Sequence, residues 1–425
     1  MKSLVKRFCE EYEMESVVSI SRLKQLPMFI WVMMVGNFFV RGTYYMVWPF
    51  LSVILIQKYN LSAAMVGLIL TGTTVASIVL GVYAGNLSDR IGRKSLMYLA
   101  AVIGVGAFML LSVADSLVVF VTAVFLATLP RSLWDSPSKA MMADALPDGK
   151  DRELALQGLY FMTNAGAALG PLFGIWAGLT GQQSSFILTA YAYIGLIIAL
   201  ILVFKQSSRS QPKQQKSEQN FAQTLRLLAT DQVFLVLIIA NILIMFIYAQ
   251  GDTSLIQYLT RANAPDLVSL IASMIILNSV VIVTCQFPLL KLLENFPVKQ
   301  RIYIGIGLLA ISQLVYAFNP VDYYTGWLIA TFVLSVAEAI LFPNMNVQLD
   351  QLAPAHLRGS YFGAASLYSL GFGFAPLIGG IVLDTLGGPA LFIMGLILCL
   401  LVGALYLATG RLKRPDFTVE QGEPV

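Results

Sequence analysis

Five charged residues lie inside long apolar stretches of this sequence, where a charge is costly and therefore informative. They are Arg41, Arg131, Asp135, Asp252 and Glu338. A charge at the centre of a bilayer costs at least about 2.5–3.5 kcal/mol on insertion scales, so such residues usually mark a polar pathway. Carboxylates in that setting can take up and release protons, and guanidinium groups can hold a carboxylate through their planar fork. These residue types indicate proton and anion chemistry.

The spacing of these charges predicts which of them pair. Arg131, Asp135 and Lys139 follow one another at i, i+4 and i+8, so we expect Arg131 and Asp135 to pair along one helix face. Arg41 has no acid in its own apolar stretch, so we expect its guanidinium to hold a carboxylate-like group of a bound molecule. The alternative is a permanent pair of Arg41 with Asp135 or Glu338, in which case the charges simply hold the helices together.

Other kinds of site chemistry have few residues to support them. The 425 residues include three cysteines and one histidine, and no two cysteines form a Cys-x-x-Cys pair. The sequence therefore predicts no catalytic residues, no metal site and no disulfide framework. It also lacks the GxxxxGK[ST] motif for binding ATP. We expect a protein that is not an enzyme and uses no cofactor.

The composition places these charges in a membrane. Hydrophobic residues make up 57% of the chain and charged residues 12%, whereas soluble proteins carry about 25% charged residues. Apolar runs of about 20 residues predict about twelve membrane-spanning helices, and hence an all-α membrane protein. The predicted spans are 27–56, 64–86, 95–114, 117–142, 153–178, 183–204, 232–258, 266–290, 301–318, 322–345, 360–384 and 389–409.

Basic residues between the spans predict the orientation of the chain. Placing both termini in the cytoplasm puts nearly all Lys and Arg residues inside and leaves only Lys58 and Arg261 outside. We therefore read the net charge of +4 as a topology signal of an inner-membrane protein and expect no nucleic-acid partner. The predicted order is a cytoplasmic segment, a first six-helix bundle, a cytoplasmic linker, a second six-helix bundle and a cytoplasmic tail: 1–26, 27–204, 205–228, 229–409 and 410–425.

The two bundles are related by an internal repeat at a constant offset of 205 residues. Gly158, Gly166, Pro171 and Gly174 map onto Gly363, Gly371, Pro376 and Gly379. The same offset carries Asp89 onto Glu294 in another connection. Duplicated halves are typical of transporters that rock one half against the other around a central site.

The connection between the second and third spans carries a specific motif. Its sequence, GNLSDRIGRK from Gly85 to Lys94, resembles the G-x-L-x-D-R-x-G-R-K signature of the major facilitator superfamily. Asp89 can cap a neighbouring helix N-terminus, and Gly92 allows a tight turn. The resemblance implies a cytoplasmic gate between the halves, with Asp144 as the partner of Arg93. We call the following residues the gate motif: Gly85, Asp89, Arg90, Gly92, Arg93, Lys94 and Asp144.

A second motif lies in the fifth span. The run GAALGPLFG resembles the G-x-x-x-G-P-x-x-G motif of the antiporter branch of that superfamily. Its small residues let helix backbones pack closely in lipid, and its proline can bend the helix. We expect these residues to form a tight seal on the outer side of the membrane, unless they serve only for helix packing. This outer-seal motif consists of Gly166, Gly170, Pro171 and Gly174.

The resemblance extends to a group of bacterial multidrug and dipeptide exporters. It rests on RGTYYMVWPF beginning at Arg41, LWDSP ending at Pro137 and AEAILFP ending at Pro343. It implies a proton-coupled exporter of a small amphipathic molecule, such as a drug, a peptide-like compound or a siderophore. Such a protein works as a monomer by alternating access, and its partners are substrate, protons and lipid. The chain departs from the group at 123–125, where no arginine stands. An importer on the same fold and a non-transporting receptor or scaffold remain as alternatives.

Overall fold

The structure is a computed structural model that describes residues 16–48, 51–61, 63–179, 182–206 and 221–415, and these are almost entirely helical. Polar residues begin several of the helices. The Ser116 side chain accepts a hydrogen bond from the backbone N–H of Val119, and Asp231 does the same for Phe234. Such capping satisfies N–H groups that have no partner inside the helix.

The described helices fall into two halves. The first half contains α2 (Ile20–Gln25), α3 (Met28–Val47), α4 (Leu51–Tyr59), α5 (Ala63–Ile91), α6 (Arg93–Val113), α7 (Leu117–Ala145), α8 (Gly149–Trp176) and α9 (Ile187–Gln206). The second half contains α11 (Gln232–Asp252), α12 (Ser254–Arg261), α13 (Leu267–Leu293), α14 (Val298–Phe318), α15 (Tyr324–Leu352), α16 (Arg358–Ala364), α17 (Ser369–Leu386) and α18 (Gly388–Ala408). Between them lies α10 (Phe221–Thr230).

Ten segments of the described chain are long and apolar enough to cross a membrane. Helices α3 and α8 occupy the positions of the predicted first and fifth spans without being among these ten. The all-α membrane fold is thus confirmed, whereas the count of twelve spans stays a prediction. Several helices continue past their apolar runs into polar residues, such as Asp89 in α5 and Asp350 in α15.

Several predicted spans are not single helices, and the first, 27–56, covers α3 and part of α4. The seventh is divided at Thr253, where the backbone leaves the helical region with φ −122° and ψ −71°, into α11 and α12. The eleventh consists of α16, a tighter turn at Ala365–Tyr368, and α17. The predicted linker 205–228 also contains most of helix α10, while residues 207–220 lie outside the described residues.

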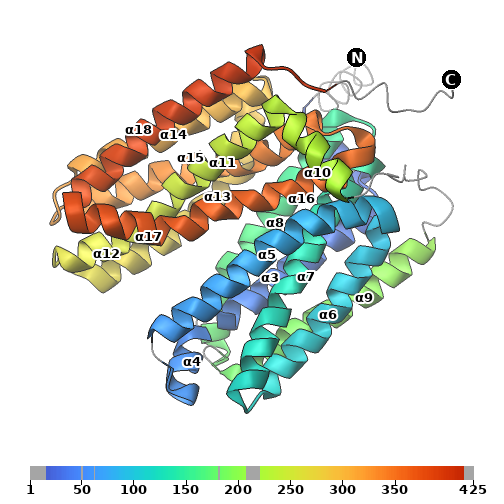
Figure 1. The fold of residues 1–425 in the computed structure, drawn as a ribbon, viewed down its shortest axis with the longest axis horizontal. Coiled ribbons are helices and arrows are strands. Elements are labelled where there is room, and N and C mark those ends of the chain that lie inside the picture. Colours follow the sequence, from blue (N-terminus) through green and yellow to red (C-terminus); the bar gives the residue numbers. More distant parts are fainter. Residues whose placement is uncertain (1–15, 49–50, 62, 180–181, 207–220, 416–425) are drawn as a thin grey trace, which may run out of the picture.

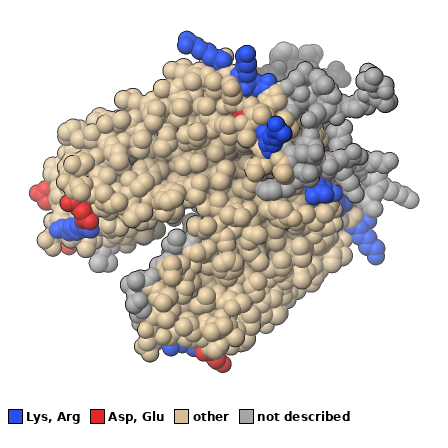
Figure 2. Space-filling view, viewed as in Figure 1, with Lys and Arg blue, Asp and Glu red and all other residues tan. Residues whose placement is uncertain are grey.

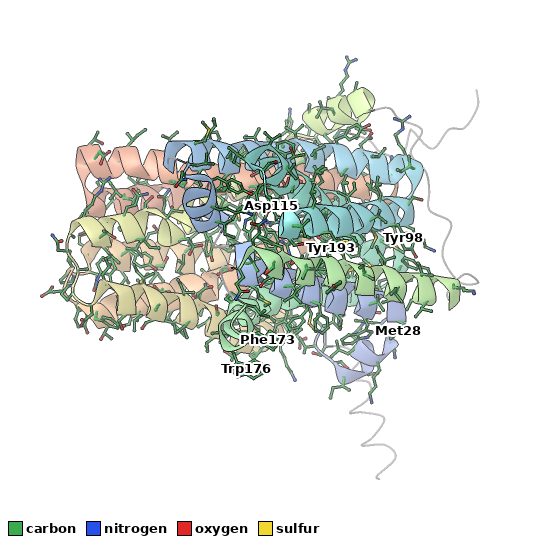
Figure 3. All side chains as sticks on the ribbon, turned by 90° about the horizontal axis from the view of Figure 1, so that it is seen from below. Met28, Tyr98, Asp115, Phe173, Trp176 and Tyr193 are labelled. Atoms are coloured by element: carbon green, nitrogen blue, oxygen red, sulfur yellow. The ribbon has the colours of Figure 1, made fainter. Side chains whose placement is uncertain are left out.

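The two halves meet at one end of the molecule and diverge at the other (Figure 1). A space-filling view shows a deep cleft between them at the diverging end (Figure 2). We call this the open end, and it carries Asp115. The opposite, closed end carries Met28 and Tyr98, and Tyr193 lies between the two ends (Figure 3). In the face shown, charged side chains gather at the two ends and leave a wide uncharged surface between them (Figure 2), as expected for a bundle surrounded by lipid.

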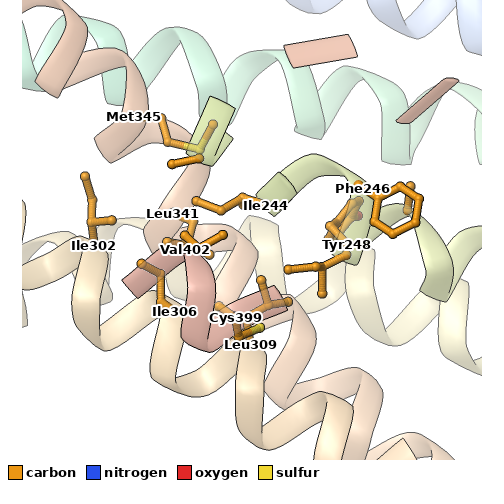
Figure 4. Close-up of a cluster of buried hydrophobic side chains, with 14 of the residues drawn as sticks. Ile244, Phe246, Tyr248, Ile302, Ile306, Leu309, Leu341, Met345, Cys399 and Val402 are labelled. Carbon is orange, nitrogen blue, oxygen red and sulfur yellow. The ribbon is translucent and has the colours of Figure 1, made fainter. Parts of the chain in front are cut away.

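Each half has its own hydrophobic core. The core of the second half brings together α11, α14, α15 and α18 through side chains such as Ile244, Ile306, Leu341 and Val402, all nearly inaccessible to solvent (Figure 4). A separate core in the first half includes Met33, Met97 and Phe120. The core of the second half also takes in Ala140 and Leu156 of the first half. Most of each core lies within one half, so the halves can move as units while the contacts between them change.

The outer-seal motif packs inside the first half. A Cβ atom at Gly166 would lie 3.1 Å from the backbone nitrogen of Gly42, and one at Gly170 would lie 2.8 Å from the Gly42 carbonyl carbon. Pro171 and Gly174 follow in the same helix, α8. The motif therefore joins α8 to α3, the helix that carries Arg41, and does not bridge the two halves in this conformation. Its role as an outer seal stays a prediction.

Replacing Gly170 by leucine should disrupt this packing. The added side chain meets backbone atoms of Gly42, which cannot move away as a side chain can, so we expect a loss of about 1–3 kcal/mol of stability and displacement of Arg41. Thermal unfolding in detergent and transport in liposomes would measure both effects. Gly195→Leu is the matched control, because a Cβ atom at Gly195 meets no other atom within 4 Å. A Gly170→Leu protein that matches this control would show that the close packing is dispensable.

Candidate functional site

The first half carries a pair of opposite charges on α3 and α7. Arg41 of α3 forms an ion pair with Asp135 of α7, with 3.8 Å between Nη2 and Oδ1. The Arg41 side chain is only 9% exposed, whereas that of Asp135 is 43% exposed. Pro130 and Pro137 lie within the same α7 segment. A buried guanidinium is thus held by a carboxylate that is itself partly exposed.

This pairing corrects the expectation that Asp135 pairs with Arg131. Arg131 is exposed, and among the described residues it forms no ion pair within 4.0 Å. The difference follows from burial. An exposed guanidinium keeps much of its hydration, whereas the buried Arg41 needs an internal partner, because an unpaired buried charge is strongly destabilising. The acid that Arg41 lacks in its own helix is supplied by α7.

The second half contributes Glu338, which is 5% exposed at the boundary between the halves. Its Oε2 atom accepts hydrogen bonds from the Tyr248 hydroxyl at 2.9 Å and from the Asn278 amide at 2.8 Å. Its Oε1 atom accepts one from the Tyr160 hydroxyl at 3.0 Å. Tyr160 belongs to α8 of the first half, so this bond joins the two halves. All three donors are neutral, and no described residue forms an ion pair with Glu338.

Tyr248 and Asn278 were not predicted from the sequence as partners of Glu338. Asn278 had a detectable signal, since it is an amide inside the apolar run of α13. Tyr248 had none, because tyrosines are common in membrane helices for other reasons. Asp252 ends α11 four residues after Tyr248 and is exposed; no described residue forms an ion pair with it.

At the closed end, Asp89 binds the start of a helix in the other half. Its Oδ1 atom accepts a hydrogen bond from the backbone N–H of Gly359 at 3.0 Å. Its Oδ2 atom accepts from the backbone N–H and the hydroxyl of Ser360, at 2.7 and 2.8 Å. These N–H groups lie in the first turn of α16, where they have no partner within the helix. The carboxylate therefore caps α16 across the junction of the halves.

Glycines allow this approach. A Cβ atom at Gly85 would lie 2.7 Å from the Cα atom of Gly363, so α5 and α16 touch backbone to backbone. Gly92 has a φ of +99° at the turn into α6, a conformation that side chains disfavour. Both positions belong to the gate motif.

The basic residues of the gate motif have different surroundings. Arg93 forms ion pairs with Asp89, at 3.4 Å, and with Asp144, and Asp144 also binds Arg358 of the second half at 3.0 Å. Lys94 lies over the ring of Phe204, 4.5 Å from its centre. Arg90 is exposed. In the part of the chain that the structure describes, neither Lys94 nor Arg90 forms an ion pair, so the predicted gate gathers around Asp89, Arg93 and Asp144.

A second connection between the halves was missed by sequence analysis. Glu153 at the start of α8 forms an ion pair with Arg301 of α14, and both side chains are buried. The Gln286 amide of α13 also donates to Gln157 of α8 at 2.6 Å. Arg301 had been read only as a topology signal. Its pairing could not be inferred, because it joins residues that are far apart in the sequence.

The chain is similar to known membrane transporters over most of its length. The Major Facilitator Superfamily model matches residues 33–369. The chain is 27% identical to an uncharacterized MFS-type transporter of Bacillus subtilis, YqjV, over 87% of this chain and 89% of that protein. It is 26% identical to a Na⁺, Li⁺, K⁺/H⁺ antiporter of Planococcus maritimus, over 81% and 87%. It is 24% identical to the multidrug resistance protein MdtH of Salmonella typhimurium, over 85% and 86%.

Solved structures share the fold. The human organic anion transporter MFSD10 superimposes with a TM-score of 0.70 at 17% identity, over 89% of this chain and 98% of that one. FucP, a transporter of the same superfamily solved in its outward conformation, gives a TM-score of 0.69 at 14% identity, over 91% and 99%.

Asp89→Asn should weaken the closed end. The amide retains the shape but loses the charge that faces three donors, and a hydrogen bond to a charged group contributes about 1.5–3 kcal/mol. Because Arg93 still has Asp144, we expect normal membrane insertion together with strongly reduced transport. Flux in liposomes at matched protein levels is the measurement. Asp115→Asn is the control, since the Asp115 side chain is 95% exposed at the open end. Wild-type flux in Asp89→Asn would contradict a role for Asp89 in the gate.

Proposed function

Because the chain belongs to the Major Facilitator Superfamily, we propose that it is a proton-coupled secondary transporter that exports a small amphipathic molecule by alternating access. Transport of small molecules across a membrane follows from the family. Export and proton coupling are supported by the similarity to a cation/proton antiporter and to a multidrug resistance protein. The positive-inside rule makes the closed end cytoplasmic, so the cleft of this conformation faces outward.

The observation that carries the proposal is the position of Glu338. Its carboxylate accepts three hydrogen bonds from neutral donors, and one of these, Tyr160, belongs to the opposite half. A proton on Glu338 adds an O–H donor to the carboxyl group, which in this buried site needs an acceptor, and reversal of the Tyr160 hydrogen bond would supply one. Protonation of a single side chain therefore changes a contact between the two halves. This is the link between proton binding and conformation that a coupled transporter requires.

The cleft suits a substrate with both apolar and polar parts. Tyr44 stacks on Trp48 with 4.6 Å between the ring centres. Tyr44 follows Arg41 by about one helical turn and Trp48 by about two. Arg131 is exposed and has no ion-pair partner among the described residues, so its guanidinium is available to an anionic group. In export, a donor group of the substrate competes with the proton for Glu338, and release of the substrate outside lets a proton bind.

The Arg41–Asp135 pair favours a second candidate, proton-coupled import. A proton on Asp135 would neutralise the partner of Arg41 and free its guanidinium for a substrate carboxylate. By thermodynamic linkage, proton and substrate then strengthen each other's binding. Under the export mechanism they weaken it. The direction in which pH changes substrate affinity therefore separates the two candidates, and absence of any flux in liposomes would favour a receptor or scaffold instead.

Proton coupling should depend on the acids Glu338 and Asp135. Glu338→Gln and Asp135→Asn keep the side-chain shape but cannot titrate, so we expect at least one of them to abolish uphill transport while exchange of substrate persists. The measurement is accumulation in liposomes under an imposed pH gradient, with an internal pH-sensitive dye to follow protons. Asp115→Asn again serves as the control. Accumulation at the wild-type rate by both variants would show that protons are carried elsewhere.

Substrate affinity should depend on the fork of Arg41. Arg41→Lys keeps the charge but loses the planar fork, so a carboxylate ligand should bind about tenfold more weakly, and Arg41→Ala should bind it more weakly still. A fluorescent amphipathic carboxylate, such as a dansyl amino acid, would be the probe, titrated at two pH values. Arg226→Lys is the control, because Arg226 is exposed on α10. Unchanged carboxylate affinity, or a preference for lipophilic cations, would show that Arg41 serves only as the structural partner of Asp135.

A further inference from the structure

The segment that precedes the first membrane helix touches both halves at the closed end. Residues 16–25, which include α2, are called the N-terminal strap here. We propose that the strap completes the cytoplasmic gate at Glu294, the repeat counterpart of Asp89, and that it must release Glu294 before the closed end can open.

The first support is that two equivalent acids receive hydrogen bonds from different parts of the molecule. The repeat maps Asp89 of the first half onto Glu294 of the second. Helix α16 begins at Arg358, so the N–H groups of Gly359 and Ser360 have no partner within the helix, and they donate to Asp89 instead. The positions equivalent to these two are Leu154 and Ala155.

Glu294 cannot cap a helix through the N–H groups at these equivalent positions. Helix α8 begins at Gly149, so Leu154 lies more than one turn inside it and its N–H group is engaged by the helix itself. The second half therefore has an acid at the gate position whose expected donors are used elsewhere.

The strap supplies the missing donors. The Ser16 hydroxyl donates to Glu294 Oε2 at 2.6 Å, and the backbone N–H of Val17 donates to the same oxygen at 2.7 Å. For the first-half acid, Ser360 of the second half likewise gives one oxygen of Asp89 both a hydroxyl and an N–H group. The two acids thus have the same kind of donor set, but only Asp89 receives it from the opposite half directly.

The strap is anchored to the first half. The Arg22 side chain, 9% exposed, donates to Asp148 at 2.6 Å and to Asp151 at 2.5 Å, and both acids lie at the start of α8. The hydrogen bond from Arg22 holds the pKa of Asp148 below its usual range, so this anchor is ionised at neutral pH. Arg22 also donates to the backbone carbonyl of Ser16 at 3.0 Å, which positions the tip of the strap.

An apolar contact closes the same junction. Val17 is 2% exposed and forms a small cluster with Leu154 of the first half and Leu290 of the second. If the halves separate at the closed end, this cluster opens and Glu294 loses its donors. Because Arg22 holds the strap to α8, the strap must stay with the first half, and its contacts with Glu294 and Leu290 are the ones that break.

Electron paramagnetic resonance distances would test this on the full-length protein in liposomes. Spin labels at Lys205 and Arg411 report on the closed end, since these exposed residues end α9 and follow α18 in opposite halves. Cys9, Cys285 and Cys399 are first replaced. We expect Glu294→Gln to raise the ratio of open to closed molecules by about tenfold, the effect of roughly one hydrogen bond to a charged group. Ser16→Ala should shift it in the same direction.

The double variant and two controls make the result decisive. If Ser16 acts through Glu294, then Ser16→Ala adds little in the Glu294→Gln background. Arg22→Gln should also open the closed end, whereas Lys24→Gln, which removes a charge from an exposed position of the same strap, should not. Asp89→Asn shows that the labels respond to opening. Unchanged distances in Glu294→Gln and Arg22→Gln would overturn the proposal and leave the strap as a passive surface segment. The assay needs neither substrate nor a proton gradient, so its outcome does not depend on the proposed export.

Discussion

A charged side chain inside a bilayer must find a partner within the protein or reach water, because lipid offers neither hydrogen bonds nor a high dielectric. The structure meets this requirement in two ways. Arg41 and Glu338 are buried and bound by other side chains, whereas Arg131 and Asp252 are exposed. Charges that face the cleft keep hydration only while it is open. Closing it must therefore bring them a substrate, a proton or each other, and this requirement ties ligand binding to conformation.

The same requirement explains why the closed end is built from helix starts. Asp89 uses N–H groups in the first turn of α16, which would otherwise be buried without partners. At the pseudo-equivalent place, α8 begins earlier and its first turn is served by Asp148, which accepts from the backbone N–H of Lys150. Duplication gave both halves an acid at this position, but the lengths of the neighbouring helices decided which donors reach it. A small shift in a helix start thus left Glu294 to the N-terminal strap.

These contacts also show which features could be predicted from the sequence and which could not. The halves, the family and the capping capacity of Asp89 follow from local patterns, since the repeat and the motif are written in short stretches. Partners in different helices do not. The pairing of Arg41 with Asp135 depends on how α3 and α7 are rotated, and the donors of Glu338 come from α8, α11 and α13. The strap was predicted only as part of a cytoplasmic segment, because Ser16 and Glu294 are 278 residues apart and their contact leaves no local pattern.

The closed end must also be weak enough to open. Three donors at Asp89, the Glu153–Arg301 pair and the strap all act across the two halves, and each hydrogen bond to a charged group contributes about 1.5–3 kcal/mol. Moving a two-state equilibrium from 1:99 to 99:1 takes about 5.5 kcal/mol. Contacts of this number would lock the present conformation unless the alternative conformation gains comparable contacts at the open end. Arg131 and Asp252, exposed and without ion-pair partners among the described residues, are the groups with most to gain there. The cycle then exchanges a set of closed-end bonds for a set in the cleft, and a proton or substrate needs to supply only the difference.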